Sequence, residues 1–303
     1  MNFDNLFKGL KITPRSFNPF LIILAISSIS CASDDTPVLK IGGIPDQDAA
    51  RLARRYEDFS KYLSDQLQVQ VEYVPSINYA AVVTAFTQNE LQVAFFGGLT
   101  GVQARLQNPG AVAIVQRVND AKFNSIFVAN PDLELTSLED LNTASKDLTI
   151  TFGSESSTSG HLWPRHFLEE AGIDPAVAFK SDPNFSGSHD LTWKLVEGGS
   201  FDIGALSESV WKRAKETGKA DLSKVEEFYI TPDYFNYNWT VRPGLDKLYG
   251  QGFTNNIRKA LLNLNMEEHS EILELFSTDQ FIETNNANYT AIQEVAENLG
   301  IIK

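Results

Sequence analysis

The chain is poor in cysteine and in basic residues, and each shortage narrows the classes of protein to which it can belong. Cys31 is the only cysteine among 303 residues, so no disulfide can form within the chain. The 39 acidic residues outnumber the 25 basic ones and give a formal net charge of −14. Because binding a polyphosphate backbone needs a basic face, this balance argues against nucleic acid as a partner. An anion site must therefore be local, built from amides, hydroxyls and a few donors.

The patterns of common catalytic sites are also missing. The four histidines lack the spacing of a metal site, and neither a G-x-S-x-G elbow nor a P-loop is present. We therefore expect no metal, no cofactor and no catalytic residue. Motifs alone leave one enzymatic alternative, an exported hydrolase of phosphate or phosphonate esters that would use Ser159 and His189.

The first 30 residues have the order of a secretory signal peptide. Three basic residues precede an apolar stretch over 20–29, which is short for a membrane span. Cys31 follows where a bacterial lipoprotein would be cleaved and acylated, although the usual leucine three places earlier is absent. We predict a signal peptide over 1–30, a tether over 31–37, and a periplasmic or otherwise extracytoplasmic protein whose only membrane contact is a lipid at Cys31. The signal-like segment also occupies the place where a ligand-sensing regulator would carry its DNA-binding domain.

The rest of the chain alternates strands and helices in two similar halves. Strands are expected over 38–44, 69–74 and 91–96, with helices over 49–67 and 79–88 between them. This order implies a parallel sheet with right-handed crossovers. We predict an α/β protein with lobe 1 over 38–127 and 239–303, lobe 2 over 128–238, and two extended crossings between them.

A hydroxyl-rich turn over 156–161, Ser-Ser-Thr-Ser-Gly-His, carries the strongest functional signal. It lies between an apolar strand over 148–153 and an expected helix from Leu162. Hydroxyls and free amides at a helix start can hold a tetrahedral oxyanion, and the helix dipole favours the negative charge. The alternative is a serine-rich loop that only caps its helix.

Three other expected helix starts carry similar chemistry. Tyr79 opens one helix among small residues, Gly97 and Gly98 follow the third strand, and His189 ends a Phe-Ser-Gly-Ser-His run over 185–189. Each is weak alone, because glycine turns and capping residues are common in α/β proteins. In open parallel sheets, however, ligands bind beyond the carboxyl ends of the strands, where such loops gather.

With the motifs at 157–161 and 185–190 in this order, the chain resembles the phosphate, phosphite and phosphonate substrate-binding proteins of ABC importers. The resemblance extends over most of the mature chain, from 44–46 to Arg242. It implies a two-lobed periplasmic-binding-protein fold of type II that closes over a small phosphorus oxyanion. It also implies a permease and ATPase complex as partner.

The resemblance assigns roles to individual residues. The expected oxyanion-binding site is formed by Thr158, Ser159 and the amides of Gly160 and His161. In it, His189 is a further donor from the same lobe, and Tyr79 is the contact from lobe 1. Glu208 stands where the family commonly has an aspartate, and would accept a hydrogen bond from a protonated ligand oxygen unless it is only a first-turn acid. The complete set of expected ligand-binding residues is Tyr79, Phe96, Gly97, Ser157, Thr158, Ser159, Gly160, His161, His189 and Glu208.

Aromatic residues over 234–239, together with Phe96, either line an apolar wall for a P–H or P–CH₃ group or pack the hinge. Their bulk and the length of Glu208 lead us to expect a small ligand such as phosphite or methylphosphonate. Larger phosphonates and phosphate stay open at this point.

Overall fold

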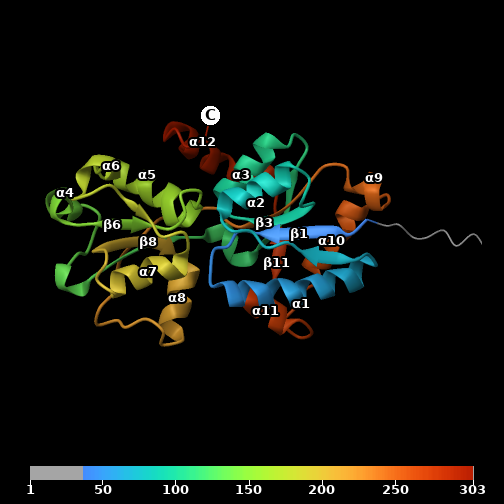
Figure 1. Cartoon of the computed structure of the whole chain (residues 1–303), viewed down its shortest axis with the longest axis horizontal. Helices are drawn as coiled ribbons and strands as arrows, with labels where there is room; N and C mark the ends of the chain where they lie inside the picture. The colour runs from blue at the N-terminus through green and yellow to red at the C-terminus, as the bar shows by residue number, and fades with distance from the viewer. Residues whose placement is uncertain (1–36, 303) are drawn as a thin grey trace, which may run out of the picture. The chain divides into compact units, whose positions relative to one another are not determined.

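Two β-sheets organise the chain in the computed structural model, which describes residues 37–302 (Figure 1). The first sheet has the strand order β11-β4-β10-β3-β1-β2. Its strands are β1 (Leu39–Gly43), β2 (Val71–Tyr73), β3 (Val93–Phe96), β4 (Val112–Arg117), β10 (Asn238–Val241) and β11 (Phe281–Glu283). The second sheet has the order β7-β6-β8-β5-β9. Its strands are β5 (Ser125–Ala129), β6 (Ile150–Phe152), β7 (Asn184–Phe185), β8 (Ile203–Ser207) and β9 (Glu226–Ile230).

Helices connect the strands within each lobe. Those that accompany the first sheet are α1 (Ala49–Leu67), α2 (Tyr79–Thr87), α3 (Gly98–Gln107), α9 (Leu245–Tyr249), α10 (Phe253–Leu262), α11 (Ser270–Phe276) and α12 (Thr290–Asn298). Those of the second are α4 (Leu141–Ala144), α5 (Trp163–Glu170), α6 (Pro175–Ala178), α7 (His189–Glu197) and α8 (Glu208–Glu216). Within residues 37–302, none of the helices combines the length and apolar character needed to cross a bilayer.

The first sheet confirms the predicted parallel pairing. β1 runs parallel to both β2 and β3, whereas β10 returns antiparallel between β3 and β4. The carboxyl ends of β1 and β3 therefore share one edge of the sheet, where the loops into α1 and α3 begin. This edge supplies the first lobe's share of the site described below.

Helix α1 shows why the local sequence folds as it does. Asp48 accepts the N–H groups of Ala50 and Arg51 and so caps the helix start. Tyr56 and Phe59 are among the apolar residues that recur at three- and four-residue steps, and both are fully buried. Each such side chain contributes roughly 1.5–3 kcal/mol when it leaves water.

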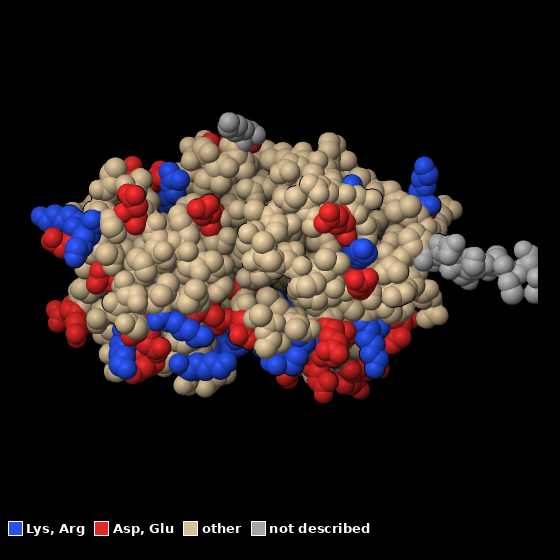
Figure 2. All heavy atoms as spheres, viewed as in Figure 1, with Lys and Arg blue, Asp and Glu red and all other residues tan. Residues whose placement is uncertain are grey.

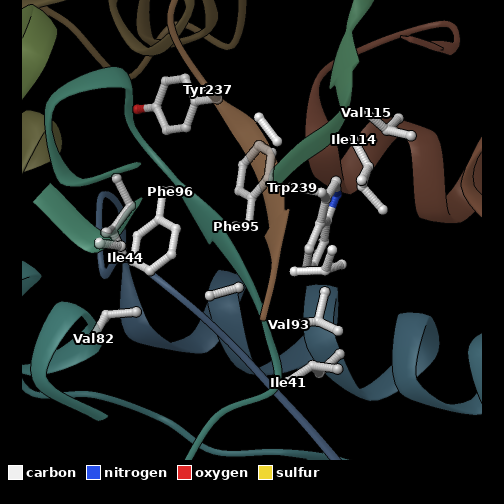
Figure 3. Packing of buried hydrophobic residues seen from close by; sticks show 14 of the residues in the cluster. Ile41, Ile44, Val82, Val93, Phe95, Phe96, Ile114, Val115, Tyr237 and Trp239 are labelled. Carbon is white, nitrogen blue, oxygen red and sulfur yellow. The ribbon is translucent and has the colours of Figure 1, made fainter. Parts of the chain in front are cut away.

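The core of the first lobe is rich in aromatic rings from both sides of the sheet (Figure 3). Trp239 of β10 stacks on Phe59 of α1 with ring centroids 4.8 Å apart, and lies 5.2 Å from Phe95 of β3. This packing fixes β10, the strand that enters the lobe directly from the second crossing segment.

Two crossing segments join the lobes and pair with each other. Phe123 and Tyr234 form an antiparallel bridge, and the Asn236 N–H donates to the Asp120 carbonyl at 3.0 Å. Strand β5 begins at Ser125 and pairs along its whole length with β8, while β10 begins at Asn238. The predicted lobe boundaries at 127/128 and 238/239 fall within β5 and β10, so the strand pairing favours boundaries a few residues earlier, before Ser125 and before Asn238.

Candidate functional site

The hydroxyl-rich turn follows β6 and opens α5, and part of it is a helix cap. The Ser157 Oγ accepts the Gly160 N–H at 2.9 Å, which uses that N–H and one acceptor site of the hydroxyl. Residues Thr158–Leu162 then form one wide π turn before α5 begins at Trp163. Such single wide turns recur at functional sites. The capping alternative therefore describes Ser157 and Gly160, while the hydroxyls of Thr158 and Ser159 are left for other partners.

Glycine at two positions lets the main chain fold tightly under the site. The Gly153 N–H donates to the Gly160 carbonyl at 2.8 Å. A Cβ atom on Gly160 would lie 3.1 Å from both the Gly153 Cα and the His189 Cε1. Glycine is therefore needed where the turn, the strand end and the imidazole approach one another.

His189 is the first residue of α7, is 1% exposed, and presents a proton on Nε2. The Ser207 N–H donates to its Nδ1 at 3.3 Å, so that nitrogen carries no proton. Burial lowers the pKa of His189 to about 4, although Asp46 and Asp190 act in the opposite direction. The ring is therefore neutral near pH 7, with its proton on Nε2. That nitrogen lies 3.4 Å from the Ser159 Oγ and 3.5 Å from the Tyr237 Oη.

Lobe 1 contributes two buried oxygen groups. The Tyr79 Oη lies near Ser157 without reaching hydrogen-bond geometry, and has no hydrogen-bond partner among the described residues. Burial raises its pKa well above the usual value, so the phenol keeps its proton. The Asp46 Oδ1, just beyond β1, likewise has no hydrogen-bond partner within residues 37–302. Burial opposes ionisation of Asp46, but the Arg55 charge and its other neighbours outweigh burial and hold the pKa below the usual value.

Hydrogen bonds between the lobes surround these groups. The Leu99 N–H donates to the Thr158 Oγ1 at 2.8 Å, and the His189 N–H donates to the Asp46 carbonyl at 3.2 Å. A third bond links the Asp48 N–H to the Asp190 carboxylate at 3.1 Å. Because the Thr158 oxygen accepts from Leu99, its own hydroxyl proton is free to donate. The structure thus places Thr158, Ser159 and His189 close to one another where the lobes meet, with the Tyr79 Oη near Ser157.

Other predicted site residues lie apart from this group. The Phe96 ring packs against Phe86 at 5.3 Å within the core of lobe 1, beside Ile44 and Val82 (Figure 3). The His161 ring lies between Phe152 and Phe185, and its Nδ1–H donates to the Glu155 carbonyl at 2.7 Å. Only the main-chain N–H of His161 is left for the predicted role.

Gly97 lies against Thr158, whereas Glu208 lies at the start of a helix of lobe 2. A Cβ on Gly97 would lie 3.3 Å from the Thr158 Oγ1, so this glycine does border the site. Glu208 is the half-buried first residue of α8 and lines a surface groove with Trp211 and Lys215. The Glu208 N–H donates to the Asn124 carbonyl at 3.3 Å, and the Glu208 charge also helps to raise the pKa of the buried Tyr234 in the second crossing segment, so its ligand-facing and first-turn roles both stay predictions.

Sequence reasoning missed two groups of the site. Asp46 directly follows the Ile-Pro pair after β1. An acidic residue just beyond the carboxyl end of an inner strand could have indicated it as a site residue, because ligands bind at that edge of such sheets. Tyr237 was considered only as an apolar ring, whereas its hydroxyl lies 3.5 Å from the His189 Nε2. Both depend on contacts across the lobes that periodicity does not reveal.

The charges around the site are nearly balanced. Arg117 donates twice to the Asp120 carboxylate at 2.7 Å, and Arg55 lies 3.5 Å from Asp46. In the view of Figure 2, acidic and basic side chains are interspersed and gather along the lower edge of both lobes. Across residues 37–302, no group of three or more histidine, cysteine or acidic side chains is placed to hold a metal ion. Neutral donors therefore dominate the site.

The histidine tautomer argues against a hydrolase. A serine nucleophile needs an imidazole whose free nitrogen faces the hydroxyl and whose other nitrogen donates to an orienting acceptor. Here the Nδ1 of His189 accepts from the Ser207 N–H, so the nitrogen that faces Ser159 carries the proton. In this tautomer the imidazole can donate from Nε2 and cannot remove the proton of Ser159.

Comparison with known proteins agrees with this geometry. Residues 41–289 match the family described as ABC transporter, phosphonate, periplasmic substrate-binding protein. The chain belongs to this family. The sequence is 43% identical over 270 residues to a probable ABC transporter phosphite-binding protein, PhnD1, of Prochlorococcus marinus, covering 88% of this chain and 91% of that protein.

Two solved structures are similar to this binding protein. PhnD1 of Prochlorococcus marinus in complex with methylphosphonate matches with a TM-score of 0.84 and 44% identity, over 88% of this chain and 99% of the other. The binding component of a phosphonate ABC transporter from Pseudomonas aeruginosa matches with a TM-score of 0.76 and 22% identity, over 86% of each chain, and supports the fold alone. The fold is the type II periplasmic-binding-protein fold, and the protein is an extracytoplasmic transport component, not an enzyme.

Proposed function

We propose that this protein captures phosphite or methylphosphonate between its lobes and delivers it to a permease and ATPase complex. One observation carries the proposal. Buried polar groups from both lobes, the Tyr79 Oη, the Ser159 Oγ and the His189 Nε2, converge with unmet or long hydrogen bonds. Buried polar groups are almost always satisfied in a complete structure, and an oxyanion with several acceptor oxygens would satisfy these.

Each donor has a distinct role in the proposal. The His189 Nε2–H and the Ser159 hydroxyl donate to ligand oxygens from lobe 2, with the Thr158 hydroxyl beside them. The Tyr79 hydroxyl donates from lobe 1, so the ligand links the two lobes. Hydrogen bonds to a charged partner contribute roughly 1.5–3 kcal/mol each. Four such donors supply affinity without a positive charge in the site.

The surroundings favour a small ligand. Gly97 and Gly160 leave no spare room beside Thr158 and His189. Of the predicted aromatic wall, Trp239 lies in the lobe 1 core, and Tyr234 donates to or accepts from the Ser125 Oγ at 2.7 Å. Tyr237 is the ring beside His189, and because Phe95 stacks on it at 5.3 Å and the Arg117 guanidinium lies 4.4 Å from its centroid, its hydroxyl is the group that would border the ligand. The methylphosphonate complex of the similar PhnD1 supports this ligand class.

Calorimetric titration with four anions tests this function. Phosphite or methylphosphonate should bind with one site per chain, and more tightly than phosphate and 2-aminoethylphosphonate. Tight binding of 2-aminoethylphosphonate without a response to the two small anions would contradict the small-ligand proposal. Turnover of a chromogenic phosphate ester above background would contradict a purely binding role.

We also propose that a lipid on Cys31 anchors the protein outside the cytoplasm. Cys31 and the predicted signal peptide lie outside the described residues, and the proposal rests on the basic and apolar order of residues 1–31. The full chain expressed in a bacterium should partition into detergent, and Cys31→Ser should partition into the aqueous phase. Aqueous partitioning of the unaltered chain would contradict the anchor.

A further inference from the structure

The Asp46 carboxylate is a buried acceptor beside a site made of donors. It is 1% exposed, and its Oδ1 lies 3.5 Å from the Arg55 Nη1 without a hydrogen bond. Its Oδ2 accepts only a 3.2 Å bond from the Gln47 amide. A carboxylate repels a fully deprotonated oxyanion, but accepts a strong hydrogen bond from an oxyanion that keeps one proton. The effect of Asp46 on binding therefore depends on whether the ligand keeps a proton, whereas the donors bind either form.

Charged and titratable groups face Asp46 from every neighbouring element. They are Arg51, Arg55 and Tyr56 of α1, Tyr73 of β2, Tyr79 of α2, Arg117 of β4, His189 of α7, Arg213 of α8 and Tyr237 of the second crossing segment. Arg55 lies closest and keeps the carboxylate ionised. Asp46 is therefore a charged acceptor when the ligand arrives.

Each of the other arginines already lies beside an acceptor of its own, although the Arg213 Nη1 has no hydrogen-bond partner within residues 37–302. Arg117 is bonded to Asp120, and Arg213 lies 3.9 Å from Asp190. Arg51 donates to the main-chain carbonyls of Glu274 and Leu275. With His189 neutral, the site has little positive charge left to balance a second negative charge on the ligand. A buried, uncompensated charge is costly, so the balance favours a monoanion.

We propose that Asp46 accepts a hydrogen bond from a protonated ligand oxygen, and so makes the site select the monoanion of a phosphorus oxyacid over the dianion. This inference rests on the proposed function. Binding changes no bond to phosphorus. When the dianion predominates in solution, each captured ligand takes one proton from the solvent and keeps it between its own oxygen and the Asp46 carboxylate.

Titration of the full chain with methylphosphonate in two buffers of different ionisation enthalpy tests this inference. At a pH above the second pKa of the ligand, the unaltered protein should take up close to one proton per bound ligand. Its affinity should fall by about tenfold per pH unit in that range, because the monoanion becomes that much rarer. Binding without proton uptake and without this fall would overturn the inference.

Asp46→Asn provides the matched variant, because its amide can donate to the dianion. Its affinity should change by less than about threefold over the same range, whereas Asp58→Asn, which removes an exposed acid of α1, should keep the full slope. An unchanged slope in Asp46→Asn would also overturn the inference.

A second probe needs no variant and so does not depend on the folding of Asp46→Asn. Dimethylphosphinate is a monoanion in which a methyl group replaces the hydroxyl of methylphosphonate. Below the second pKa of methylphosphonate, it should bind the unaltered protein at least about tenfold more weakly, a loss of about 1.4 kcal/mol. Equal affinity would overturn the inference, whereas failure to bind any of the oxyanions would instead contradict the proposed function.

Discussion

His189 contacts three different segments of the chain, each through a different nitrogen atom. Its main-chain N–H bonds to the Asp46 carbonyl, its Nδ1 accepts from Ser207, and its Nε2–H faces Ser159. The sequence motif located this histidine correctly as a residue at a helix start. The direction of its proton could not be predicted, because it depends on a main-chain amide of β8 that is distant in sequence.

His189→Ala should weaken methylphosphonate binding by about 1.5–3 kcal/mol, or roughly 10- to 150-fold, because one hydrogen bond to a charged ligand is lost. Calorimetric titration measures the change. His166→Ala is the matched control, since His166 lies on α5 with its Nε2 3.4 Å from the Glu170 Oε1, away from Ser159 and His189. Equal affinity of the His189 variant and the control would place the site elsewhere.

His161 and His189 should also make stability depend on pH. Burial lowers the pKa of both to about 4, from an ordinary value near 6.5. Between these values the unfolded chain binds more protons than the folded chain, so the stabilisation is complete above pH 6.5 and is lost as the pH falls toward 4. Urea unfolding should show a loss of about 2 kcal/mol per histidine between pH 7 and pH 5.

His161→Gln should remove about half of this loss, because His189 would then be the remaining one of the two buried rings with a lowered pKa. A free energy of unfolding that is the same at pH 5 and pH 7 would contradict the neutral, buried state of both rings.

At the scale of elements, the apolar spacing predicted the helices well. The expected helix over 49–67 matches α1, and that over 79–88 matches α2 within one residue. Strands β4 and β9 were not anticipated, because β4 is buried at every residue but its first and β9 is mostly half-buried, so neither shows a clear alternation of buried and exposed residues. The π turn at Thr158 was not predictable either, since its extra residue is held by the Ser157 cap and by contact with Gly153.

Gly160→Ala should disturb this turn. Its Cβ would lie 3.0 Å from the Ser157 Oγ and 3.1 Å from the His189 Cε1, so the cap or the imidazole must move. Overpacking of this kind costs roughly 1–3 kcal/mol of stability. Thermal unfolding should show that loss, and titration should show a fall in affinity of at least about tenfold, since two donors shift together. Unchanged affinity with normal stability would show that the turn does not shape the site.

For the whole molecule, the order of strands and helices was enough to predict two lobes and two crossings. The groups that meet between the lobes were not predictable, because bonds such as Leu99 N–H to Thr158 join segments on different sheets. Glu208 illustrates the limit. The family pattern suggested a carboxylate at Glu208, whereas the buried carboxylate beside His189 is that of Asp46, which no pattern in the sequence indicated.

Thr158→Val should weaken the coupling between ligand binding and lobe contact. The substitution keeps the shape of the side chain but removes the acceptor of the Leu99 N–H and one ligand donor. A ligand at 100 times its dissociation constant stabilises the folded protein by about 2.7 kcal/mol. At the same methylphosphonate concentration, the variant should show a clearly smaller rise in Tm than the unaltered protein. An equal rise would contradict a role for Thr158 in either contact.

A crystal structure of the protein with methylphosphonate tests the central claim most directly. The account predicts density for a tetrahedral group between the lobes, with its oxygens within hydrogen-bond distance of the Ser159 Oγ, the His189 Nε2 and the Tyr79 Oη. Density in another place, such as the surface groove lined by Arg51 and Arg213, or an unliganded site at saturating methylphosphonate, would contradict it.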